Sequence, residues 1–151
     1  MALAHHQTLP LSIGSRTADI DRGMWRIIAA LWMLRVDTIQ CCEKQEPVVS
    51  EGHPNPPPAR AYIVFPCATM AEMFLGFCPE DIVEREWELQ THFFTEPMMG
   101  RAVLRTTILI PPRWIPTITV ALVERIREHW GIDLDERYQR CRRTTQPWSD
   151  P

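Results

Sequence analysis

Two parts of this chain follow the same outline, in which a β-rich run ends at a proline and leads into an amphipathic helix. The first is Tyr62-Ile-Val-Phe-Pro66, which leads to helical spacing from Met70, and the second is Ile108-Leu-Ile-Pro111, which leads to Ile115. Another strand-like run precedes each of them. Because a hairpin followed by a helix is a common way to cover one sheet face, the outline predicts an α+β fold with a four-stranded, mainly antiparallel sheet.

The hydrophobic periodicity predicts seven elements in the order αββαββα. Spacings of three and four indicate helices, and alternation of side chains indicates strands. Pro79 ends the middle helix, and Gly131 stands just past the end of the last helix, where glycine is common. The expected helices are 19–35, 70–78 and 116–130, and the expected strands are 36–42, 60–66, 87–94 and 101–110.

The first expected helix has an apolar face that starts at Ile20. Trp25 and Trp32 widen this face, so that the helix is apolar around most of its circumference. Such a helix must be covered on two sides, either by a sheet and a neighbouring helix or by another subunit. Association between copies through this helix, or through the second hairpin, is therefore one expectation.

The chain has 151 residues, of which 45% are hydrophobic, and these values are typical of one ordinary domain. We expect this domain to span 17–132, after a loosely ordered leader over 1–16 and before a C-terminal tail over 133–151. The segment 43–59 contains five prolines and should be a long loop. Loops of that length are usually functional or disordered, so this one is a candidate for covering a ligand or contacting a partner.

Charge and hydropathy exclude several classes of protein. No apolar run approaches the roughly 20 residues that span a bilayer, and the first residues lack a signal-peptide pattern, so we expect no membrane and a cytoplasmic location. The net charge is −3, and 15 of the 16 basic residues are arginines scattered along the chain. Nucleic acid is disfavoured as a partner because it requires clustered cations.

The second hairpin carries the main candidates for binding. Trp87, Leu89, Thr91 and Phe93 alternate with polar residues, which predicts one face toward the core and one toward water. Arginine beside aromatic residues is also the composition of protein interfaces and nucleotide-stacking pockets. The alternative, which we favour for Trp87 and Phe93, is that these rings fill the core. The candidate ligand-binding or partner-binding residues are Arg101, Arg105 and Trp114 near the hairpin, with His53 and Arg60 in and after the proline-rich loop.

Cys67 is the strongest candidate for a nucleophile. It precedes an expected helix N-terminus, where unsatisfied N–H groups and the helix dipole lower the pKa of a thiol. His92 is the histidine placed to act as its base. A buried structural cysteine is the more common case, so a thiol-dependent enzyme using Cys67 with His92 is the alternative hypothesis. The acidic run from Glu80 to Glu88 is expected to be a solvated face and not a carboxylate pair for catalysis.

The sequence predicts neither a metal site nor a cofactor. The chain contains no C-x-x-C spacing, and an antiparallel first hairpin would keep Cys67 away from Cys41 and Cys42. The nucleotide-binding, hydrolase and metalloprotease motifs are also absent from the sequence, and six glycines leave little material for a phosphate-binding loop.

The stretch Leu31–Glu43 contains the run W-M-L-R-V-D-T-I-Q-C-C-E. It resembles a pattern in small uncharacterised bacterial and phage proteins, in which an apolar helix precedes a Thr-x-x-Ser-Cys-Glu strand end. The resemblance implies no particular activity. The sequence as a whole favours a small binding or regulatory protein without catalytic activity, bacterial or phage-associated, that acts on a protein partner or a small ligand.

Overall fold

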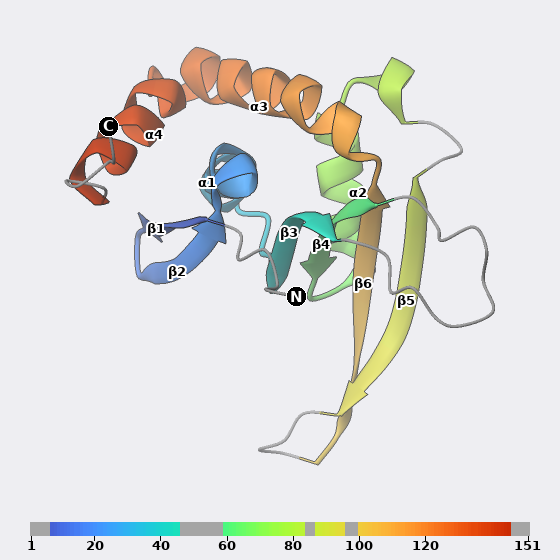
Figure 1. The fold of residues 1–151 in the computed structure, drawn as a ribbon. Coiled ribbons are helices and arrows are strands. Elements are labelled where there is room, and N and C mark those ends of the chain that lie inside the picture. Colours follow the sequence, from blue (N-terminus) through green and yellow to red (C-terminus); the bar gives the residue numbers. More distant parts are fainter. Residues whose placement is uncertain (1–6, 46–58, 84–86, 96–99, 146–151) are drawn as a thin grey trace.

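The computed structural model describes residues 7–45, 59–83, 87–95 and 100–145. They form an α+β fold with a two-stranded and a four-stranded sheet (Figure 1). The strands are β1 (Thr8–Ile13), β2 (Arg16–Asp21), β3 (Gln40–Gln45), β4 (Arg60–Phe65), β5 (Glu88–Thr95) and β6 (Ala102–Ile110). The helices are α1 (Trp25–Met33), α2 (Ala68–Phe77), α3 (Ile115–Trp130) and α4 (Leu134–Thr145), with single 3-10 turns η1 (Arg22–Met24), η2 (Glu80–Ile82) and η3 (Pro112–Trp114).

The larger sheet has the strand order β3-β4-β6-β5, and every neighbouring pair is antiparallel. Ile63 at the centre of β4 lies opposite Cys41 of β3 on one side and Ile108 of β6 on the other. The two predicted hairpins therefore join side by side through β4 and β6. This arrangement confirms the expected α+β class and the four-stranded antiparallel sheet.

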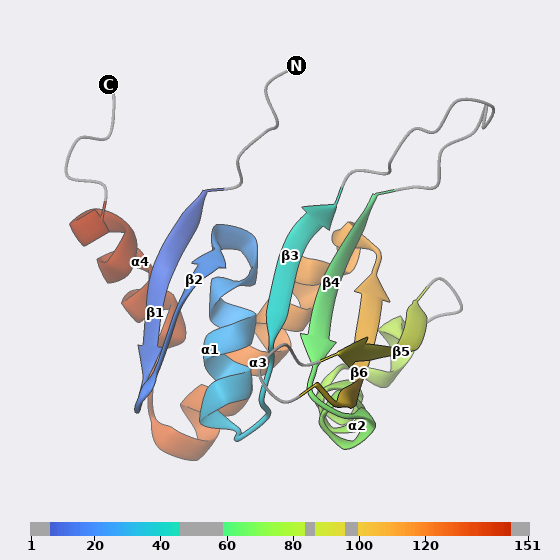
Figure 2. The same ribbon diagram turned by 90° about the horizontal axis from the view of Figure 1, so that it is seen from below.

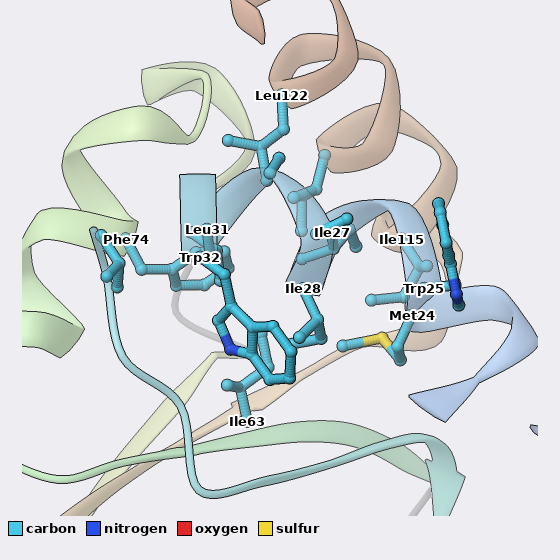
Figure 3. Close-up of a cluster of buried hydrophobic side chains, with 14 of the residues drawn as sticks. Met24, Trp25, Ile27, Ile28, Leu31, Trp32, Ile63, Phe74, Ile115 and Leu122 are labelled. Carbon is cyan, nitrogen blue, oxygen red and sulfur yellow. The ribbon is translucent and has the colours of Figure 1, made fainter. Parts of the chain in front are cut away.

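One face of this sheet is buried under helices. Alternate residues of β4 (Ala61, Ile63 and Phe65) are fully buried, as a strand with one covered face requires. Figure 3 shows side chains of α1 gathered with Phe74 of α2, Leu122 of α3 and Ile63 of β4. The apolar helix α1 is thus covered within the chain. Its Trp25 and Trp32 are buried, so the expected association of copies through this helix is not supported.

The expected helix over 19–35 is shorter than predicted at both ends. Residues 16–21 form β2, because Ile20 also continues an alternating pattern whose buried side faces the core. At the other end Arg35 adopts a left-handed φ of 63°, and the N–H of Val36 donates to the carbonyl of Leu31. This bond closes the helix in a Schellman turn, so the next strand begins at Gln40 and not at Val36.

The expected loosely ordered leader is wrong for the residues described from Gln7 onward. Thr8–Ile13 forms β1, which pairs with β2 along its whole length. Gly14 makes the turn between the strands possible with its positive φ of 59°. Leu9 and Leu11 are almost completely buried, so the hairpin adds to the core of the domain.

The C-terminal segment is also more ordered than a tail, since residues 134–145 form α4 beside β1 (Figure 2). The Asp133 carboxylate caps this helix by accepting hydrogen bonds from the backbone N–H groups of Asp135 and Glu136, at 3.0 and 3.2 Å. The second of these bonds is the main cause of a lowered pKa of Asp133. Leu134 is fully buried and anchors the helix to the core.

Candidate functional site

The outer end of the β5–β6 hairpin extends beyond the rest of the sheet (Figure 1). β5 pairs with β6 from Glu88 opposite Leu109 to Thr95 opposite Ala102. The neighbouring strand β4 reaches only residues 106–110 of β6. Among the described strands, residues 102–105 of β6 therefore pair with β5 alone.

Three apolar side chains on this hairpin are exposed on the same side, and we call them the hairpin face. Phe93 is 78% exposed, the opposite Leu104 is 46% exposed, and Leu89 is 55% exposed. Leu89 shares its row with the buried Ile108 and Ile63, so the face continues the helix-covered side of the sheet beyond the helices. Exposed apolar side chains that cluster in this way mark interaction sites.

The expectation that Leu89 and Phe93 face the core is therefore wrong. Their alternation with polar residues correctly placed them on one side of the strand, but alternation does not reveal what covers that side. Trp87, at the start of this run, is half-buried and packs against the core. A usable signal was strand length, because the expected strand 101–110 is longer than the expected strand 60–66 and must extend past it.

The backbone edge of β5 adds a second binding feature. β5 stands at the end of the sheet, so alternate residues, half of its eight, direct their N–H and C=O groups away from β6. Natural proteins protect such edges with lysine, proline or a bulge. The segment Leu89–Thr95 contains no proline, lysine, arginine or carboxylate, and its register with β6 is continuous. No strand in the described part of the chain pairs with this edge, so it is available to another extended segment.

The opposite edge of the sheet is closed by a pair of carboxylates, which we call the carboxylate strap. The N–H of Gly23 donates to Oε2 of Glu43 at 2.9 Å, and the N–H of Glu43 donates to Oδ2 of Asp21 at 3.0 Å. A Cβ atom on Gly23 would stand only 2.0 Å from that Oε2. β3 also carries a bulge between Cys42 and Gln45. The edge of β3 is thus bonded to the segment that precedes α1.

Burial and nearby charge suppress the reactivity of the thiols in the strap region. The pKa of Cys41 is raised to about 12, first by burial and then by the Asp21 carboxylate. Burial is also the main cause of the raised pKa of Cys42. Because the thiolate is the nucleophilic form, both side chains are poor nucleophiles at neutral pH.

The structure does not bring Cys67 and His92 together. Cys67 is exposed at the N-terminus of α2, on the helix-covered side of the sheet. Thr91 shares a row with the buried Phe65, so the next residue, His92, lies on the opposite side. In the part of the chain that the structure describes, neither side chain forms a hydrogen bond or ion pair. This placement gives no support for a thiol–imidazole pair.

The five residues proposed for ligand or partner binding do not form one site. Arg105 lies opposite His92 on β6, and Arg101 is exposed at the outer end of the same hairpin. Trp114 is half-buried in η3, at the other end of β6, where the Arg113 guanidinium stacks on its ring at 5.3 Å. Arg60 begins β4 at that same end, and His53 lies outside the described residues.

Two of the hollows on the described surface are lined in part by cysteines. The first, about 400 Å³, separates β1 from α4, and its lining includes Arg137, Arg140 and Cys141. Arg140 is already paired with Glu136 at 2.7 Å, and burial raises the pKa of Cys141. The second, about 430 Å³, lies between α2 and α3 and includes Cys78, whose pKa burial raises to about 12. Neither hollow presents an activated thiol.

Residues 7–45, 59–83, 87–95 and 100–145 lack two further features. Within these ranges no three histidine, cysteine or carboxylate side chains lie close enough together to hold a metal ion. None of the helices there combines the length and the apolar character that crossing a bilayer requires.

Comparison with known proteins found no matching family model, no matching curated protein and no matching solved structure. The function must therefore be inferred from the geometry of the surface itself. The hairpin face and the open edge of β5 are the two features that point to a binding event.

Proposed function

We propose that this chain is a protein-binding module without catalytic activity of its own, and that it binds through β5. The observation that carries the proposal is the 78% exposure of Phe93 on a strand with an open edge. A single exposed apolar residue is ordinary, but Phe93 is flanked on its own face by Leu89 and Leu104. Together they offer an apolar surface next to backbone groups with which no described strand pairs.

The mode of binding that fits this surface is strand addition. In this mode an extended segment of the partner pairs with the sheet edge, so that main-chain hydrogen bonds provide affinity and alternate side chains provide specificity. On β5 the alternate residues Leu89, Thr91 and Phe93 would meet apolar side chains of the incoming strand. We expect a partner segment that is extended, weakly charged and apolar at every second position.

The chemistry of the described cysteines supports a role other than catalysis. The pKa values of Cys41 and Cys78 are raised to about 12, so both are protonated at neutral pH. Cys67 is exposed, but it has no base in contact among the described residues. Three of the exposed large apolar side chains, in contrast, lie on one face of β5 and β6, namely Leu89, Phe93 and Leu104.

The proposal is tested with a fluorescently labelled eight-residue peptide that alternates valine and threonine, titrated with the full chain and followed by fluorescence anisotropy. We expect saturable binding that is about tenfold weaker in the Phe93→Ser variant, since tenfold corresponds to about 1.4 kcal/mol and a large aromatic contact is worth that much. Val120→Ser is the control, because Val120 is also an exposed apolar residue, at 57%, but lies on α3.

A second peptide, in which proline replaces one valine and the adjacent threonine at the centre, tests the backbone contribution, because one of these two residues must direct its N–H toward β5 and proline cannot donate a hydrogen bond. We expect it not to bind. Equal binding of both peptides, or equal binding by the Phe93→Ser and Val120→Ser variants, would contradict strand addition at β5.

A further inference from the structure

We infer that the extended segment recognised by β5 is β5 of a second copy of this chain, paired antiparallel about a two-fold axis at Thr91. This inference rests on the proposed function and specifies its partner. The result would be one continuous eight-stranded sheet, in which the four strands of one copy follow the four strands of the other.

The sequence of β5 complements itself about Thr91. With Thr91 opposite its own copy, Leu89 of one chain lies opposite Phe93 of the other, and Phe93 lies opposite Leu89. Leu104 is already opposite Phe93, and Ile108 is already opposite Leu89, within each chain. Pairing therefore creates two apolar rows that run across both copies, each built from Leu104, Phe93, Leu89 and Ile108. Cross-strand apolar pairs of this kind are the stabilising units of a sheet.

Other registers lose this match. A two-fold axis at Gln90 would place Leu89 opposite Thr91, and an axis at His92 would place Phe93 opposite Thr91. A register that places odd-numbered residues opposite even-numbered ones would turn the hairpin faces of the two copies to opposite sides of the sheet and would not be two-fold symmetric. The register centred on Thr91 is thus the one that pairs both apolar residues of β5 on a shared face.

Charge does not oppose this register. Glu88 is the one formally charged residue of β5 at neutral pH, counting histidine as neutral, and it would lie opposite Phe94 and not opposite the other Glu88. His92 would lie opposite Gln90. Like charges directly opposite one another would destabilise the pairing, and this arrangement contains none.

The closed state of the opposite edge sets the size of the assembly. Glu43 and Asp21 bond β3 to residues before α1, so the four-stranded sheet of each chain offers one open edge, at β5, among the described strands. The β5 edges of two copies pair with each other in a symmetric contact, after which neither four-stranded sheet has an open edge. The assembly we infer is therefore a dimer.

The experiment uses the full chain in analytical ultracentrifugation over a wide concentration range. We expect the native chain to sediment with twice its 17.6 kDa mass at high concentration. Thr91→Lys and Thr91→Glu each place like charges opposite themselves across the axis, and each should weaken self-association about fivefold, at the upper end for one cross-strand pair. An equimolar mixture of the two variants should restore the dimer, because opposite charges then face each other.

Val120→Lys, which adds the same charge on α3, should dimerise like the native chain. Thr91 is exposed, so circular dichroism should show that its variants remain folded. A native chain that stays monomeric yet binds the valine–threonine peptide would overturn the second copy as partner while leaving strand addition intact. A dimer that the Thr91 variants do not weaken, or a mixture that does not restore it, would overturn the register.

Discussion

The two edges of the four-stranded sheet have opposite designs. At β3 the backbone N–H of Glu43 is bonded to Asp21, the Glu43 carboxylate is bonded to Gly23, and a bulge interrupts the strand. At β5 the register is continuous, charges are absent after Glu88, and Phe93 is exposed. The contrast teaches that residues distant in sequence bond one edge of the sheet, whereas no strand among residues 7–45, 59–83 and 100–145 pairs with the outer edge of β5.

The largest effect on stability should come from opening the β3 edge. Glu43→Ala removes the acceptor of the Gly23 N–H and leaves that part-buried donor unpaired, which should lower the free energy of unfolding by about 1–3 kcal/mol. Urea denaturation measures this change. Glu72→Ala on the exposed side of α2 is the control and should stay within about 0.5 kcal/mol of the native chain. Equal stability of the two variants would mean that the strap contributes nothing.

A smaller loss, about 1 kcal/mol, is expected from Gly23→Ala, comparable to one net hydrogen bond. The new Cβ would displace the Glu43 carboxylate, which can rotate away but then loses its bond to the Gly23 N–H. The same substitution should cost less when Glu43→Ala is already present, because the bond is then gone. Additive losses in the double variant, measured by urea denaturation, would contradict this coupling.

Asp21→Asn should change the reactivity of the Cys41 thiol more than it changes the free energy of unfolding. Asp21 is the second cause, after burial, of the raised pKa of Cys41, so loss of its charge should lower that pKa and speed alkylation severalfold at pH 9. Mass spectrometry of iodoacetamide-treated protein measures the rate. Cys78 is the internal control, because its pKa of about 12 is due to burial alone.

The same shift gives the native chain a pH dependence with a defined sign. The pKa of Cys41 is about 12 in the folded protein and 9.0 in the ordinary thiol. The stability linked to this group is therefore complete below pH 9 and is lost as the pH rises toward 12. An unfolding free energy that rises over this range would contradict the assignment.

The smallest effect on stability is expected at the β5 edge. Phe93→Ser removes a ring that is 78% exposed, so the free energy of unfolding should change by only about 0.5 kcal/mol. Self-association should nevertheless be lost, because Phe93 belongs to both apolar rows of the inferred dimer. A large loss of stability in dilute, monomeric protein would show that Phe93 belongs to the core instead.

The elements with long, regular patterns could be predicted from the sequence. α2, α3, β4, β5 and β6 begin and end within two residues of expectation, because periodicity, prolines and Gly131 all indicate the same bounds. The β1–β2 hairpin was missed because Pro10 interrupts a short alternation and Ile20 fits both a helical and a strand period. α4 was missed because it carries few apolar residues, and its stability depends on the Asp133 cap and on the buried Leu134.

The candidate site was predictable only in part. Alternation placed Leu89 and Phe93 on one side of β5, but coverage of that side depends on where the helices end, which is a tertiary property. The carboxylate strap gives no local signal at all, since Gly23 and Glu43 are 20 residues apart and their contact is a property of the tertiary structure. Arg101 and Arg105 do lie on the hairpin, whereas Trp114 and Arg60 lie at its other end.

The strap at Glu43 has a consequence for the fate of this chain at high concentration. A subunit with an open strand at each edge of its sheet would pair with another copy at both edges, and the assembly would grow into filaments. The two hydrogen bonds at Glu43 occupy the edge of β3. They would therefore limit association to the edge of β5 and prevent the chain from polymerising into insoluble aggregates.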